Sequence, residues 1–208
     1  MGPPPVHLWN PPYCGDLDIR IGRDGQWWYL GTPIGREPLV KLFASVLKLE
    51  DGRYFLVTPV EKIGITVDDA PFVAVDFRVE ADASGADGSL DGQHGGRADA
   101  AHSGAHGWAR TGAHGGLHSG AHIVFTTNVG DETVAGPDNP IRVVRDPTTG
   151  EPAPYVHVRR GLEALIDRKS FYRLVDIGEV RPHGGEDWFG LASGGVFFPI
   201  IPAAELEL

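Results

Sequence analysis

The ten residues Ile34–Phe43, IGREPLVKLF, have a counterpart late in the chain, Ile166–Val175, IDRKSFYRLV. Both begin Ile-x-Arg, and both place a basic residue and then two apolar residues at matching positions. Each copy follows a hairpin signal, Arg23-Asp24-Gly25 in the first case and Arg159-Arg160-Gly161 in the second. A strand-turn-strand-helix unit used twice predicts two related modules packed together, rather than one catalytic fold with a single cleft.

The patterns around these segments predict an α+β protein. Apolar positions from Leu39 to Leu47 trace one face of a helix over about 37–48, and Lys169–Val175 forms a second helix of about two turns. Short apolar or alternating runs predict strands near residues 19–21, 27–30, 54–58, 63–67, 73–79, 122–127, 141–144, 155–158, 162–166, 188–189 and 196–198. We therefore expect two small packed modules of antiparallel strands with one short helix each, related as an internal repeat.

One stretch lacks the residues of a core. Residues 81–121 are mostly Gly, Ala, Asp, Ser and His, and this composition buries too little apolar surface to offset the entropy of ordering. We expect a disordered loop there, between an N-terminal module over 1–80 and a C-terminal module over 122–208. The strands on either side are predicted to pair antiparallel, which makes the stretch an overgrown hairpin loop.

Six of the nine histidines lie in this loop or at its edge. Neutral imidazoles bind transition metals, so a metal-binding tract is one interpretation. The alternative is a tolerated insertion whose histidines came with its loose Ala-His-x-Gly repeat. The histidines have no fixed ligand spacing, so we favour the insertion and predict no metal site.

Charge and composition exclude several classes of partner. The chain of 208 residues carries a net charge of −10, which disfavours nucleic acid and anionic membrane surfaces. Its first residues lack the pattern of a signal peptide, and no stretch approaches the ~20 apolar residues that cross a bilayer. The single cysteine, Cys14, has no internal partner for a disulfide. These features favour a cytoplasmic location.

The densest acidic group consists of Glu61, Asp68 and Asp69, with Lys62 and Arg36 as counter-charges. An enzyme would use such carboxylates for acid–base chemistry or to hold a hard cation. However, adjacent residues of a strand point to opposite faces, and Asp69 precedes Ala-Pro, where a turn favours a capping carboxylate. We favour a structural role for these acids.

Two arginines and two tryptophans are the candidates for binding. Arg36 and Arg168 each come just before a helix, where a guanidinium and the free N–H groups of the helix together suit an anion. Both also suit hydrogen bonds to carbonyl groups at the corner between strand and helix. Trp27 and Trp28 suit the wall of an apolar groove, although one of two neighbours in a strand belongs to the core.

Several motifs in order resemble the domain of unknown function 1285 family of bacterial proteins. They are Cys14-Gly15-Asp16, 24–29 (DGQWWY), 31–36 (GTPIGR), 56–62 (LVTPVEK), 67–72 (VDDAPF), 125–131 (FTTNVGD) and 161–168 (GLEALIDR). The resemblance covers nearly the whole chain except the His-rich stretch, which departs from the short hairpin of the family. It implies a two-part α+β fold with repeated motifs and a role in signal transduction, and it implies no established catalytic residues.

We therefore expect a protein that binds a small ligand or a protein partner, without catalysing a reaction and without a cofactor. One alternative is a hydrolase or metal-dependent enzyme using Glu61, Asp68 and Asp69. A second alternative is a structural protein-interaction module. Strongly perturbed carboxylate pKa values in a cleft would favour the enzyme, an enclosed apolar pocket the ligand, and a broad apolar patch the interaction module.

Overall fold

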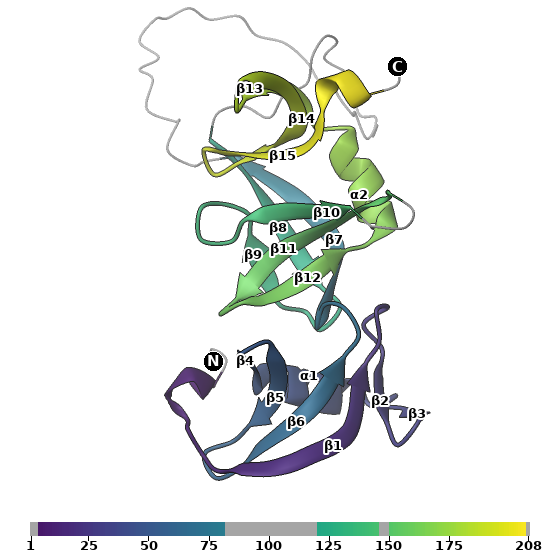
Figure 1. The fold of residues 1–208 in the computed structure, drawn as a ribbon, viewed down its shortest axis with the longest axis vertical. Helices are drawn as coiled ribbons and strands as arrows, with labels where there is room; N and C mark the ends of the chain where they lie inside the picture. Colours follow the sequence, from purple (N-terminus) through teal and green to yellow (C-terminus); the bar gives the residue numbers. More distant parts are fainter. Residues whose placement is uncertain (1–3, 82–119, 146–149, 207–208) are drawn as a thin grey trace, which may run out of the picture.

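The protein is built from three β-sheets stacked along its longest axis (Figure 1). A computed structural model describes residues 4–81, 120–145 and 150–206. The predictions for residues 82–119, including most of the His-rich stretch, lie outside these residues. We call residues 4–67 the first module and residues 72–206 the second module.

The first module holds a six-stranded sheet in the order β3-β2-β1-β6-β5-β4. Its elements are a short 3-10 helix (Val6–Leu8), β1 (Tyr13–Ile21), β2 (Trp27–Tyr29), β3 (Thr32–Pro33), α1 (Glu37–Ser45), β4 (Leu47–Glu50), β5 (Arg53–Val57) and β6 (Lys62–Val67). The C-terminal half of α1 faces the second module, since Arg159 donates to the carbonyl of Ala44 at 2.9 Å.

The second module holds a six-stranded sheet in the order β10-β11-β12-β7-β8-β9, and a three-stranded sheet, β13-β14-β15. Its elements are β7 (Phe72–Ala81), β8 (Ala121–Thr127), β9 (Glu132–Val134), β10 (Ile141–Arg145), β11 (Pro152–Arg159), β12 (Leu162–Ile166), α2 (Arg168–Val175), β13 (Glu179–His183), β14 (Glu186–Ser193), β15 (Val196–Pro202) and a short 3-10 helix (Ala203–Glu205). Buried Ser193 ties the two sheets together, because its hydroxyl accepts from the N–H of Ile123 and donates to the carbonyl of Ala135.

The two six-stranded sheets share one topology, which confirms the predicted internal repeat. Each consists of two three-stranded meanders, and the first strand of the sheet lies beside the sixth. These central pairs, β1 with β6 and β7 with β12, are parallel, whereas the modules were expected to contain antiparallel strands only. In each sheet the parallel pair joins the first strand of one meander to the last strand of the other.

The short sequence echo does not mark equivalent elements. Helix α1 lies between the third and fourth strands of its sheet, whereas α2 follows the sixth strand of the other. The hairpins also differ, since residues 22–26 join β1 to β2 and the two residues Arg160-Gly161 join β11 to β12. The match between Ile34–Phe43 and Ile166–Val175 is therefore a resemblance of two helix starts.

Two boundaries and one burial pattern differ from the sequence-based expectation. Helix α1 ends at Ser45 instead of near residue 48, because Leu47–Glu50 pairs with β5 around the tight turn Asp51-Gly52. Strand β7 belongs to the second sheet, so the first sheet ends at Val67 and not near residue 80. The expected alternation along β7 also breaks: its pairing with β8 shifts between Ala74 and Asp76, and Val75 and Val79 are exposed.

One continuous apolar core runs through both modules. Trp27 of the first module is fully buried and stacks on Phe43 of α1 with 6.0 Å between ring centroids. The same cluster includes Phe72, Ile123 and Leu191 of the second module. Because the two modules share this core, their relative position is fixed by packing and not by the linker alone. Among the described residues, no helix is both long and apolar enough to cross a bilayer.

Candidate functional site

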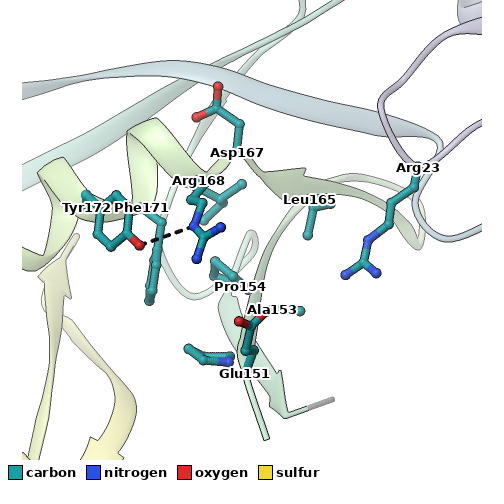
Figure 2. A pocket seen from close by; sticks show the side chains of 11 residues that line it. Arg23, Glu151, Ala153, Pro154, Leu165, Asp167, Arg168, Phe171 and Tyr172 are labelled. Carbon is teal, nitrogen blue, oxygen red and sulfur yellow. Dashed lines mark hydrogen bonds between the residues drawn. The ribbon is translucent and has the colours of Figure 1, made fainter. Parts of the chain in front are cut away.

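A cavity of about 750 Å³ lies where the two modules meet (Figure 2). This volume is within the usual range of small-molecule sites, ~300–1,000 Å³. Arg23, from the connection between β1 and β2, is the single contribution of the first module. The remaining lining residues come from β11, β12, α2 and the residues just before β11 and α2: Glu151, Pro152, Ala153, Pro154, Leu165, Ile166, Asp167, Arg168, Phe171 and Tyr172.

Arg168 is placed by the start of α2. The helix begins there because the carboxylate of Asp167 accepts the N–H of Ser170 at 2.7 Å, as an N-cap. The Nε of Arg168 donates to the hydroxyl of Tyr172 one turn later, at 3.2 Å. This hydrogen bond is the main cause of a raised pKa at Arg168, which keeps the guanidinium charged. Its two terminal nitrogens point into the cavity in Figure 2.

Arg23 is held from the other side by Asp69, in the linker between the modules. The Nε of Arg23 lies 3.1 Å from a carboxylate oxygen of Asp69. The other oxygen of Asp69 accepts the hydroxyl of Tyr155, on β11, at 2.8 Å. Burial raises the pKa of Tyr155 to about 12, and the hydrogen bond to Asp69 acts in the same direction. Asp69 therefore joins both modules beside the cavity.

The wall between the two arginines is largely apolar. Pro154 is buried and Leu165 is half-buried. Figure 2 shows Leu165 between Arg23 and Arg168, Phe171 beside Arg168 on the side away from Arg23, and the carboxylate of Asp167 turned away from the cavity. The arrangement suits an anionic molecule with an apolar portion, because the guanidinium forks recognise carboxylate or phosphate and the wall covers the remainder.

The structure brings one of the candidate residues, Arg168, to this cavity. Trp27 is enclosed in the core and is not available to a ligand. Trp28, its neighbour in β2, is half-buried on the opposite face of the strand. Arg36 is exposed immediately before α1 and does not line the cavity.

The acidic candidates are not brought together. Glu61 is exposed just before β6, whereas Asp68 and Asp69 follow its last residue, so the length of the strand separates them. Asp68 is paired with Arg20 at 2.5 Å and 2.8 Å, and this pairing lowers the pKa of Asp68. The turn before β6 is capped by the hydroxyl of Thr58, which accepts the N–H of Glu61 at 3.1 Å.

Lys62 belongs to a structural cluster. It contacts Glu50 at 2.8 Å, and Lys48 contacts the same carboxylate at 2.6 Å. The two lysines lower the pKa of Glu50. Within residues 4–81, 120–145 and 150–206, no group of three or more His, Cys, Asp or Glu side chains is placed to hold a metal ion.

The sequence did not predict a site that combines Arg23, Asp69 and Tyr155. Arg23 was noted as part of a turn, and that signal says nothing about what the turn faces. Its place at the cavity results from the packing of the two modules, which no local pattern encodes. The Ile-x-Arg motif marks both Arg168, which lines the cavity, and Arg36, which does not.

Comparison with known proteins identifies the family of the chain. Residues 4–70 match the N-terminal domain model, and residues 109–200 the C-terminal domain model, of the domain of unknown function DUF1285. No curated protein matches the chain.

Two solved structures match. One is a DUF1285 family protein from Silicibacter pomeroyi DSS-3, 53% identical, with a TM-score of 0.76, covering 100% of this chain and 92% of that one. The other is a DUF1285 family protein from Shewanella baltica OS155, 25% identical, with a TM-score of 0.45, covering 76% of this chain and 91% of that one. Both family domains match in order and the first relative spans the whole chain, so this chain belongs to the DUF1285 family.

Proposed function

We propose that this protein is a non-catalytic ligand-binding protein that takes up a small anionic molecule in the cavity between its modules. The observation that carries the proposal is the convergence of Arg23 and Arg168 on one partly apolar cavity. Two charged donors and an apolar wall provide recognition, whereas acid–base catalysis also needs a carboxylic acid or base with a matched pKa.

The titratable groups support binding over catalysis. The described carboxylates with a shifted pKa are Glu37, Glu50, Asp68, Asp76 and Glu132, and in each the shift is downward. Hydrogen bonds from lysine or arginine side chains are the main cause in every case. Such groups are held as anions by ion pairs, which is typical of structural carboxylates.

We propose that this binding takes place in the cytoplasm and serves signal transduction. In that process the bound small molecule changes the surface that the two packed modules offer to a protein partner. The family resemblance suggests the process, and the position of the cavity between modules supports it. A ligand that contacts both modules stabilises their packed arrangement by mass action.

Native mass spectrometry of freshly purified protein tests the proposal. We expect an anionic small molecule to co-purify with the natural sequence and to be lost from Arg168→Gln. Arg36→Gln is the matched control, because Arg36 is also an exposed arginine before a helix but does not line the cavity. Equal occupancy in all three proteins would place the ligand elsewhere.

A further inference from the structure

We propose that the ligand carries two anionic groups separated by an apolar spacer, with one group bound by Arg23 and the other by Arg168. This inference rests on the proposed function and specifies its ligand class. It begins from the fact that the two arginines belong to different modules, so the ligand spans the junction.

Both guanidinium groups are engaged through Nε. Arg168 donates from Nε to the hydroxyl of Tyr172 at 3.2 Å, whereas Arg23 forms an ion pair with Asp69 whose oxygen lies 3.1 Å from Nε without accepting a hydrogen bond. An arginine has five N–H donors, so each side chain keeps both terminal nitrogens for a further acceptor. A terminal pair of this kind matches the two oxygens of a carboxylate or phosphate.

The acids around the cavity do not remove this capacity. Asp69 binds Arg23 from the linker side, and the carboxylate of Asp167 is committed to the N–H of Ser170. Glu151 lines the cavity and raises the pKa of Arg168 by its charge. An incoming anion therefore competes with Glu151 for Arg168, and its affinity includes the cost of that competition.

The surface between the arginines determines the middle of the ligand. Pro154 and Leu165 contribute apolar contacts there. A spacer of methylene groups or a similar apolar unit gains from this surface, whereas a charged spacer would lose its hydration. A ligand with one anionic group would bind one guanidinium and leave the terminal nitrogens of the other without an anionic acceptor. The ligand class is therefore an α,ω-dianion, either a dicarboxylate or a bisphosphate.

Isothermal titration calorimetry with defined probes tests this inference. The probes are straight-chain α,ω-dicarboxylates and α,ω-bisphosphates of increasing length, each compared with the monocarboxylate or monophosphate of the same length. We expect one length to bind about tenfold or more tighter than its monoanion, since a second charge-assisted pair is gained. The better of the two series identifies the anionic group.

Substitutions test which arginine binds each anionic group of the ligand. Arg23→Gln should reduce the affinity of the best dianion to that of the monoanion. Arg23→Lys keeps the charge beside Asp69 but loses the fork, and it should give an intermediate affinity if the first variant unfolds. Glu151→Gln should tighten binding, and Arg36→Gln should leave every affinity unchanged.

The outcomes separate the two proposals. Equal binding of dianion and monoanion, with loss in Arg168→Gln and no effect of either Arg23 variant, would overturn the two-ended ligand and leave the anion-binding function standing. A failure of every probe, together with no anionic molecule co-purifying with the natural protein, would overturn both.

Discussion

Asp69 connects three parts of the chain through one carboxylate. It lies in the linker between the modules, accepts the hydroxyl of Tyr155 at 2.8 Å and pairs with Arg23 at 3.1 Å. The sequence predicted a structural role for this residue from its position before Ala-Pro. The sequence did not predict its contacts with Tyr155 and Arg23, because these depend on how the two modules pack.

We predict that Asp69→Ala lowers the free energy of unfolding by about 1–3 kcal/mol, since the buried hydroxyl of Tyr155 loses its acceptor and Arg23 loses its counter-charge. Asp69→Asn should cost less, because an amide oxygen still accepts from Tyr155. Urea denaturation of the three proteins measures the difference. Equal loss in both variants would show that the charge, and not the acceptor, is what the junction needs.

Tyr155 gives the protein a stability limit at high pH. Its pKa is raised to about 12 by burial and by Asp69, against roughly 10 in an unfolded chain. The fold favours the neutral phenol, so this contribution is complete below pH ~10 and is lost as pH rises toward 12. We predict a fall in stability across that window that is reduced in Tyr155→Phe, measured by urea midpoints at successive pH values. Identical pH profiles for the two proteins would contradict this assignment.

Residues that line the cavity were predictable only where a local pattern marks them. The Ile-x-Arg motif marks Arg168, but it marks Arg36 equally, and Arg36 does not line the cavity. Two neighbouring tryptophans in a strand predict that one is core, and the folded chain shows that it is Trp27. Arg23 carries no local mark, because its place at the cavity depends on a surface more than a hundred residues further along the chain. The acidic group of Glu61, Asp68 and Asp69 is close in sequence only, since β6 extends between its members.

At the scale of elements, the connection between β1 and β2 decides where Arg23 lies. Gly25 has a φ of +77° and its carbonyl accepts the side-chain amide of Asn128 at 3.2 Å. The same Asn128 accepts the N–H of Val73 at 3.0 Å. A Cβ on Gly25 would lie 2.5 Å from that amide nitrogen and 3.0 Å from a methyl of Val73. The turn is therefore packed against the second module as well as conformationally demanding.

A matched pair of glycine variants separates these two demands. Gly52 has nearly the same φ, +76°, but open space around its Cβ position. We predict that Gly52→Ala costs about 1–2 kcal/mol from left-handed strain alone, and that Gly25→Ala costs clearly more because Asn128 must also move. Urea denaturation provides both values. An equal loss would mean that the contact with Asn128 adjusts freely.

Elements with strong local signals were predicted well, and their ends were not. Asp-Gly turns and alternating apolar runs located most strands, and the apolar pattern of Lys169–Val175 located α2. The end of α1 was missed because Val46 and Leu47 continue the apolar face of the helix while Leu47 already pairs with Leu56. The exposure of Val75 was missed because it lies at a register shift that no residue pattern announced. The exposure of Val79 has no such cause, since Phe77 on the same face after the shift is buried.

At the scale of the whole molecule, the repeat is a property of the sheets. Both six-stranded sheets consist of two meanders closed by a parallel pair, although their helices occupy different positions in the order. The sequence predicted a repeat through a helix motif that marks non-equivalent elements. Such a topology depends on pairing between strands that are far apart along the chain. A single sequence does not show those pairings.

The shared core predicts that both modules unfold together. Trp27 of the first module and Phe72 of the second are fully buried in one cluster, and Arg159 reaches across to the carbonyl of Ala44 at 2.9 Å. Separating the modules would expose this apolar surface, so neither module retains its stability alone. We predict a single urea transition with the same midpoint by tryptophan fluorescence and by far-UV circular dichroism. Arg159→Gln should shift both midpoints to lower urea by the same amount. Two resolved transitions, or a shift in one signal only, would show that the modules are independent units joined by their linker.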